Sequence, residues 1–105
     1  MVCLVTHPEE GAARFARLLV ERRVAACVNQ LRATSTYRWQ GAVHEDAEVL
    51  LVVKTCREEL EHLDRILDEH HPYDVPELIA LRPEQVGPAY LDWWLGELGE
   101  ARGDS

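Results

Sequence analysis

Short apolar runs and amphipathic segments alternate along this chain. Residues 2–6 form an apolar, β-branched run, which predicts a buried strand. Pro8 suits the first turn of a helix, so we expect a helix to start there. Its apolar positions recur at spacings of three and four residues, as in a helix that packs one face on a sheet. These positions are Ala12, Phe15, Leu18 and Leu19.

Two longer segments with β-type composition follow. Residues 24–31 and 34–39 are rich in small apolar, β-branched and aromatic side chains, and together they predict one long, bent strand. Gln40 and Gly41 form a turn signal. The apolar run at residues 48–55 then predicts a strand that pairs with the first as an antiparallel hairpin.

The last part of the chain predicts a helix, a strand and a terminal helix. Residues 57–70 place apolar side chains at helical spacing, with acidic side chains mainly on the other face. A loop bounded by two prolines, residues 71–76, leads to a short strand at residues 78–81. Aromatic residues between Tyr90 and Trp94 mark a short C-terminal helix.

The order of these elements is β-α-β-β-α-β followed by a helix. This order predicts a single α+β domain over residues 1–98 with a ferredoxin-like antiparallel sheet, a long hairpin of the second and third strands, and two helices on one face. A chain of 105 residues suits one such domain. The polar residues 99–105 are expected to form a mobile tail.

Charge and composition narrow the classes of function. The net charge of −8 disfavours nucleic acid as a partner and draws cations, although an acidic surface is also the usual means of solubility. No stretch approaches the roughly 18 apolar residues that span a bilayer, and the N-terminus lacks a signal-peptide pattern, so we expect a cytoplasmic protein without membrane contact. The three cysteines form no C-x-x-C pair, which argues against a disulfide framework.

Sequence motifs for catalysis are absent. The chain has no nucleophile elbow, Walker loop, dinucleotide-binding glycine motif or H-E-x-x-H pair. The remaining catalytic hypothesis uses His71 and Glu77 as acid and base, and no nucleophile accompanies them. We therefore expect a binding protein rather than an enzyme.

Tyr37 and Trp39 lie two residues apart, on the same face of the predicted long strand. The helices already cover one sheet face, so partner subunits are the expected cover of the other face. The alternative is that the two rings form a core stripe within one chain.

The segment from His71 to Glu77 is a loop stiffened by two prolines, and it also carries Tyr73. An imidazole and carboxylates are ligands for Zn²⁺ or Cu²⁺ and also serve in proton transfer. A purely structural turn is the competing interpretation.

Cys27 and Lys54 lie in apolar strands. Cys27 is either a small buried hydrophobe or, as a soft thiolate near His71, a ligand that prefers copper. Lys54 is expected to reach solvent or to pair with a carboxylate such as Glu77. Cys3 and Cys56 are expected to serve in packing only.

Four blocks of sequence resemble the CutA divalent-cation-tolerance family. In order they are Ala25-Ala26-Cys27-Val28-Asn29, then Ser35-x-Tyr37-x-Trp39-x-Gly41, then Lys54-Thr55, and then His71-Pro72-Tyr73-x-Val75-Pro76-Glu77. The similarity continues through Tyr90-Leu91-x-Trp93 and covers roughly residues 2–95. It implies a ferredoxin-like subunit in a tight homotrimer, in the manner of the PII signalling proteins.

The resemblance also implies a set of functional positions. Cys27 and His71 match places where family members are suspected to bind metal. The positions that match the lining of inter-subunit clefts are Tyr37, Trp39, Lys54, Tyr73, Glu77 and Trp93. The leading hypothesis is a divalent-cation binding protein for chiefly Cu²⁺, with Zn²⁺ as a further candidate, that contributes to metal homeostasis. The alternative is a PII-like signalling or scaffold trimer that binds a small molecule or a protein in its clefts.

Overall fold

A computed structural model describes residues 1–99 of the chain. These residues form four strands and three α-helices, with a 3₁₀ turn, η1, before the second helix. In chain order the elements are β1 (Val2–Pro8), α1 (Ala12–Glu21), β2 (Cys27–Trp39), β3 (Ala42–Lys54), η1 (Arg57–Glu59), α2 (Leu60–His70), β4 (Ile79–Leu81) and α3 (Pro88–Gly96). No helix within residues 1–99 has the length and apolar character needed to cross a membrane.

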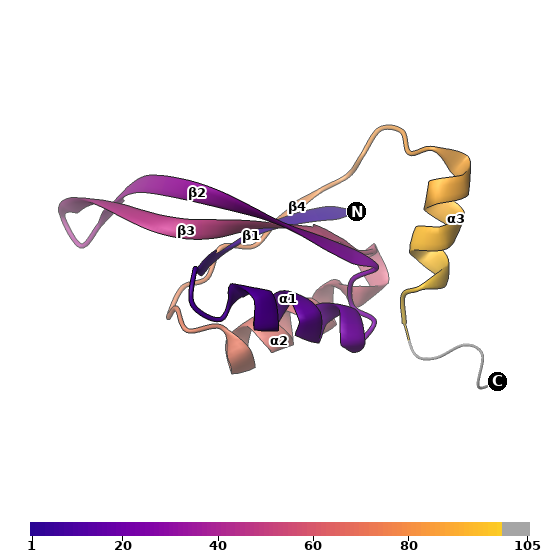
Figure 1. Ribbon diagram of the computed structural model, residues 1–105, viewed down its shortest axis with the longest axis horizontal. Coiled ribbons are helices and arrows are strands. Elements are labelled where there is room, and N and C mark those ends of the chain that lie inside the picture. Colours follow the sequence, from indigo (N-terminus) through magenta and orange to yellow (C-terminus); the bar gives the residue numbers. More distant parts are fainter. Residues whose placement is uncertain (100–105) are drawn as a thin grey trace.

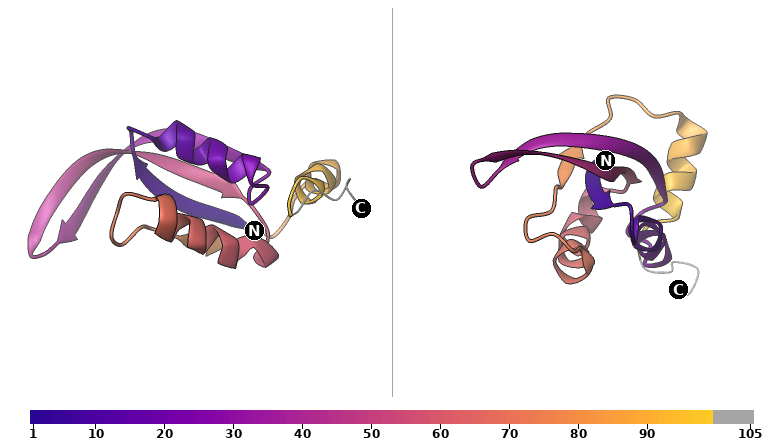
Figure 2. Two further views of the ribbon diagram at one scale, coloured as in Figure 1. Left: turned by 90° about the horizontal axis from the view of Figure 1, so that it is seen from below. Right: turned by 60° about the vertical axis from the view of Figure 1, so that its left-hand side comes forward.

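The four strands form one antiparallel sheet in the order β2-β3-β1-β4. Helices α1 and α2 lie next to each other on one face of this sheet, and α3 lies beyond one end of it (Figures 1 and 2). This arrangement confirms the predicted ferredoxin-like α+β fold, with its helices on one face and its long β2-β3 hairpin.

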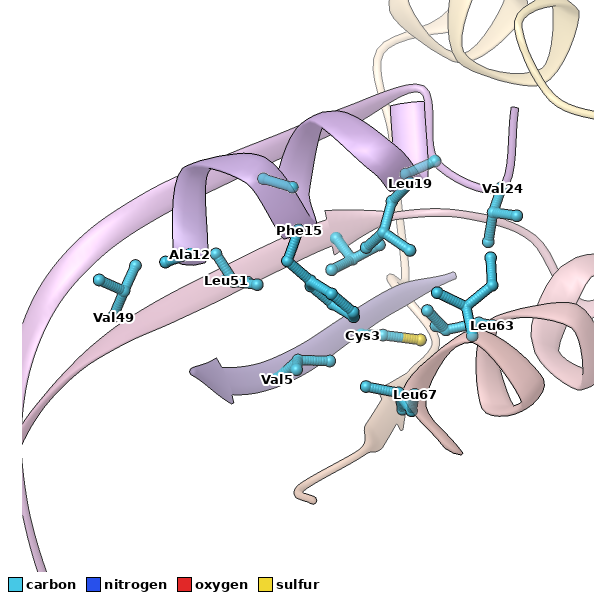
Figure 3. Packing of buried hydrophobic residues seen from close by; sticks show 14 residues of the cluster. Cys3, Val5, Ala12, Phe15, Leu19, Val24, Val49, Leu51, Leu63 and Leu67 are labelled. Atoms are coloured by element: carbon cyan, nitrogen blue, oxygen red, sulfur yellow. The ribbon is translucent and has the colours of Figure 1, made fainter. Parts of the chain in front are cut away.

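The core lies between the sheet and the two helices (Figure 3). Successive side chains of a strand point to opposite faces, so Val49, Leu51 and Val53 of β3 all point toward the helices. Full burial of each such side chain contributes about 1.5–3 kcal/mol. The helices supply the matching apolar faces, from Phe15, Leu19, Leu63, Ile66 and Leu67.

The β2-β3 hairpin is longer than the sequence indicates. The strands pair from Cys27 opposite Lys54 to Trp39 opposite Ala42, so β3 starts six residues before the predicted position 48. Gln40 and Gly41 both have positive φ, 50° and 83°, as in the turns that match the twist of paired strands. Residues 43–47 include charged side chains and lack the apolar alternation by which a strand is recognised in a sequence. This part of the hairpin extends past the helices, so it has no apolar face to bury (Figure 1).

The predicted start of the first helix at Pro8 is wrong. Pro8 is the last residue of β1, where it lies opposite Glu48 of the extended β3. Gly11 then adopts a left-handed conformation with φ of 87°, and the helix starts only after this reversal, at Ala12.

The predicted start of the second strand at residue 24 is also too early. The backbone N–H groups of Val24 and Ala25 both donate to the carbonyl of Leu19, at 3.0 and 3.2 Å. These residues therefore close the end of α1, and β2 begins at Cys27.

The face of the sheet opposite α1 and α2 is apolar over residues of all four strands, and we call it the open face. Strand alternation and register place alternate residues of each strand on it. Its apolar side chains are half-buried or exposed, and Leu31 is 48% exposed. They are Leu4, Leu31, Leu50, Val52, Ile79 and Leu81.

Helix α3 is attached at one end of the sheet. Trp94 is 3% exposed, and its indole N–H donates to the carbonyl of Thr55 at 2.9 Å. Gly99, the first residue of the predicted tail, donates its backbone N–H to the carbonyl of Arg23. The rest of the predicted tail lies outside the described residues.

Candidate functional site

A cleft of about 780 Å³ lies between the outer part of the β2-β3 hairpin and the loop that follows α2. Three aromatic rings and three carboxyl groups line it, and no Lys, Arg or His side chain among residues 1–99 contributes to its lining. The lining residues are Thr6, Ser35, Thr36, Tyr37, Trp39, Glu48, Pro72, Tyr73, Asp74, Val75, Pro76 and Glu77.

The loop over residues 71–77 lies at the edge of β1, because β4 is too short to cover that edge. Strand β4 pairs only with residues 2–4 of β1, which leaves the edge of β1 free at Thr6. His71 fills this place, because its Nε2–H donates to the Thr6 carbonyl at 2.8 Å. The loop is therefore held to the sheet edge by a side chain where a strand would otherwise pair.

Both ring nitrogens of His71 are used within the chain. The Thr6 carbonyl requires a proton on Nε2, and the backbone N–H of Tyr73 donates to Nδ1 at 3.1 Å. His71 is therefore the neutral tautomer with its proton on Nε2. Its ring also packs against His7, with ring centroids 4.8 Å apart. A metal ion could bind His71 only if one of these hydrogen bonds were broken.

Burial lowers the pKa of His71 below its ordinary value, and the nearby His7 adds to this effect. The hydrogen bond to Thr6 and the charge of Glu48 act in the opposite direction. The folded protein thus favours the neutral imidazole.

This depressed pKa predicts a loss of stability in mild acid. As the pH falls below about 6.5, the unfolded chain takes up a proton on His71 that the folded chain resists, so the free energy of unfolding falls. We expect urea denaturation in EDTA-containing buffer, at one protein concentration, to show this fall between about pH 7.5 and pH 6.

A His71→Gln variant should show a smaller pH dependence over the same range, and the control His44→Gln, at an exposed position, should not. An equal pH dependence in His71→Gln and the unmodified protein would contradict this account. Glu77 changes the stability in the opposite direction: its pKa is raised in the folded chain, so its protonation at lower pH increases the free energy of unfolding. The contribution of His71 is therefore read from the difference between the His71→Gln variant and the unmodified protein.

Glu48 is the residue of the cleft that the sequence did not suggest. It is 6% exposed, and the Tyr73 hydroxyl donates to its Oε2 at 2.6 Å. Burial, this hydrogen bond and the Glu48 charge together raise the pKa of Tyr73, so the phenol stays protonated and keeps donating. The sequence feature that could have indicated Glu48 is the alternation of faces along β3, which places residue 48 on the face opposite Val49.

Glu77 lies close enough to Glu48 to respond to its charge. Burial raises the pKa of Glu77, and the negative charge of Glu48 raises it further. The cleft therefore concentrates negative charge in a partly desolvated place.

Tyr37 and Trp39 line the same cleft from β2. They are 41% and 45% exposed, so the alternative of a core stripe within one chain is wrong. The Tyr37 hydroxyl donates to the Asp46 carboxylate, and its ring stacks on His44 with centroids 5.5 Å apart. These contacts fix the Tyr37 ring on the hairpin.

Cys27 and Lys54 form a separate cluster, because they lie opposite each other in the β2-β3 pairing. The Lys54 Nζ contacts the side-chain oxygen of Asn29 and lies 3.9 Å from the Cys27 Sγ. No carboxylate within residues 1–99 lies at ion-pair distance from Lys54, so the expected pair with Glu77 is not formed in the chain.

The structure does not bring Cys27 and His71 together in one chain. Cys27 lies across β3 from the Val2 end of β1, whereas His71 is bound to Thr6. Those two β1 residues are four positions apart, which is about 13 Å along a strand. Within residues 1–99 no group of three or more His, Cys, Asp or Glu side chains is placed to hold a metal ion.

Of the six predicted cleft residues, the structure places four in this cleft, namely Tyr37, Trp39, Tyr73 and Glu77. Lys54 lies in the Cys27 cluster, and Trp93 lies on α3, where it is 45% exposed next to Tyr90. Neither of these two lines the cleft of its own chain.

Comparisons with known proteins agree on one family. The profile described as CutA1 divalent ion tolerance protein matches residues 1–97. The divalent-cation tolerance protein CutA of Thermus thermophilus is 49% identical over 94 residues, which cover 88% of this chain and 91% of that protein. The mouse protein CutA is 46% identical over 91 residues, which cover 85% of this chain and 51% of the mouse protein.

Solved structures give the same answer for the fold. The Thermus thermophilus divalent cation tolerance protein superposes with a TM-score of 0.88 at 47% identity, over 93% of this chain and 97% of the other. A structure described as the PII-like protein CutA from Nostoc, in apo form, superposes with a TM-score of 0.88 at 36% identity, over 93% and 96% of the two chains.

Proposed function

This chain belongs to the CutA1 divalent ion tolerance family, and on that premise we propose that it is a cytoplasmic binding protein for divalent cations, chiefly Cu²⁺, that contributes to metal tolerance. The observation that carries this proposal is the family match over residues 1–97. The net charge of −8 supports it, because an acidic protein attracts cations. The proposed role is one of binding and not of catalysis.

We assign the metal to Cys27 and His71. Cys27 is half-buried, and thiolate sulfur is a soft ligand that suits copper. Since Cys27 and His71 lie apart in one chain, one metal ion could bind both only as Cys27 of one subunit and His71 of a neighbouring subunit, with water completing its ligands. His71 must give up a hydrogen bond to bind, so Cys27 is the stronger ligand of the two.

The required neighbour is supplied by a homotrimer, which is the assembly we propose. The open face exposes apolar side chains from all four strands, and the helices of the same chain cover only the opposite face (Figure 2). An apolar face of this kind is stabilised when it is buried against another subunit. The hairpin that extends past the helices provides further surface for contact between chains.

The test is a calorimetric titration of metal-stripped protein with Cu²⁺, Zn²⁺ and Mg²⁺. We expect saturable binding of Cu²⁺ and weaker binding of Zn²⁺, because sites with nitrogen and sulfur ligands have a higher affinity for Cu²⁺ than for Zn²⁺. Mg²⁺ should not bind measurably at the same site, because it prefers oxygen ligands. Absence of saturable Cu²⁺ binding would contradict the proposed function.

The second candidate function is a PII-like trimer whose clefts bind a small molecule. The cleft at Glu48 favours it, since about 780 Å³ is a volume typical of ligand sites and greatly exceeds the need of one metal ion. The name of the Nostoc relative, a PII-like protein, points in the same direction.

A further inference from the structure

We infer that the cleft between the β2-β3 hairpin and the loop at residues 71–77 binds a small organic cation, an amine or alkylated ammonium compound. The inference rests on the second candidate function, that of a cleft that binds a small molecule, and specifies the class of ligand. It does not rest on the copper site proposed at Cys27 and His71.

The charge of the lining favours a cation. Glu48, Asp74 and Glu77 contribute carboxyl groups, and within residues 1–99 no basic side chain of the same chain lines the cleft. Lys54 of a neighbouring subunit, which the family resemblance places in the inter-subunit cleft, would add one positive charge to these three carboxyl groups. Glu48 is also nearly buried, so its charge is weakly screened by solvent. A bound ammonium group would offset this charge, whereas an anionic ligand would be repelled.

The aromatic lining favours an organic cation over a metal ion. Tyr37, Trp39 and Tyr73 offer three rings, and a ring face attracts an ammonium group while it also packs against its alkyl substituents. Metal ions need several donor atoms, and no group of three such side chains is found within residues 1–99. The geometry thus combines the two features by which proteins recognise ammonium ligands, ring faces and carboxylates.

The hydrogen bonds of the lining keep these groups in place before a ligand arrives. Tyr73 is held at Glu48 by its hydroxyl and at His71 by its backbone N–H, and Tyr37 is held at Asp46. Because these side chains are ordered without a ligand, little conformational entropy is lost on binding.

The test uses metal-stripped, assembled protein and two probes, choline and butane diamine. Binding is followed by the fluorescence of the tryptophans and by calorimetry. The comparison ligand is the neutral isostere of choline, in which a tert-butyl group replaces the trimethylammonium group. We expect saturable binding of at least one cationic probe, and affinity for choline at least about tenfold higher than for its isostere.

Substitutions at two cleft positions, each with a control, connect binding to the cleft. Glu48→Gln removes the charge but retains an oxygen for the Tyr73 hydroxyl, and it should weaken binding about tenfold. Its control is Glu45→Gln, the same change at an exposed position of the same strand outside the cleft, which should have no effect. Trp39→Leu should weaken binding more than Trp39→Phe, because only Phe retains a ring face.

The possible results distinguish a failure of the organic-cation inference from a failure of the second candidate function, a cleft that binds a small molecule. Equal binding of choline and its isostere would overturn the cation inference and leave a small-molecule cleft. Binding of neither cationic probe would also overturn it, and a thermal-shift screen with neutral and anionic metabolites would then decide the second candidate function. Unchanged choline affinity in Glu48→Gln would place the ligand elsewhere and overturn the inference as well.

Discussion

Replacing Leu31 with glutamate is expected to convert the proposed trimer into single chains. Leu31 lies on the open face, on the edge strand β2 opposite Leu50 of β3, and is 48% exposed in one chain. If a partner covers this face, the new carboxylate is buried without a counter-charge, which costs several kcal/mol. Because Leu31 has few contacts to lose in its own chain, the fold itself should persist.

Size-exclusion chromatography with light scattering measures the effect, and circular dichroism confirms the fold. The control is Val20→Glu, which places the same charge at a 41% exposed position of α1, away from the open face. This control should elute as the unmodified protein does. A Leu31→Glu protein that stays trimeric would show that the open face is not the interface.

Replacing Cys27 with serine is expected to lower the affinity for Cu²⁺ about a hundredfold. Changes in the groups that only orient a metal ligand already cost about 10–100-fold in metal affinity, and the loss of the soft sulfur ligand itself should be at the upper end of that range. Serine has nearly the same size, so the strand pairing with Lys54 should be retained.

The matched control is Cys56→Ser, which changes another half-buried cysteine that we expect to serve in packing only. Copper affinity is measured by competition with a chelator of known affinity, on protein whose trimeric state has been verified. A His71→Ala variant in the same assay should lose affinity to a smaller extent. If Cys27→Ser and His71→Ala both bind copper as the unmodified protein does, the assigned metal site is wrong.

The elements that contact the core were predictable from the sequence, and the parts that extend past it were less so. The alternation at Val49, Leu51 and Val53 and the helical spacing of Phe15 and Leu19 reflect burial against a single core, so each pattern is local. The first half of β3 has no such pattern, because the helices do not cover it. Its strand character depends on β2, and its start was therefore predicted six residues too late.

The candidate site depends even more on contacts between distant segments. Sequence reasoning found the chemistry of the loop that begins at His71 and the aromatic pair of β2. It did not find Glu48, since the hydrogen-bond partner of that carboxylate is Tyr73, 25 positions later in the chain. Nor could it assign both nitrogens of His71, because the free edge at Thr6 results from the short pairing of β4.

Lys54 shows the same limit of local patterns. A lone cation at the end of an apolar strand predicts a side chain that reaches solvent or an ion pair, with Glu77 or an acid of a partner subunit as the candidate partner. The register places Lys54 opposite Cys27 instead, so its ammonium contacts Asn29 and the cysteine sulfur. Register is a property of two paired strands, and no single segment specifies it.

Native mass spectrometry of the metal-stripped protein, titrated with Cu²⁺, tests the central claim most directly, because one spectrum gives both the number of subunits and the number of bound ions. We expect a trimer that takes up three copper ions in a saturable manner, and that loses this uptake when Cys27 is replaced by serine. A monomer, or a trimer that binds copper only in proportion to the added concentration without a defined endpoint, would contradict it.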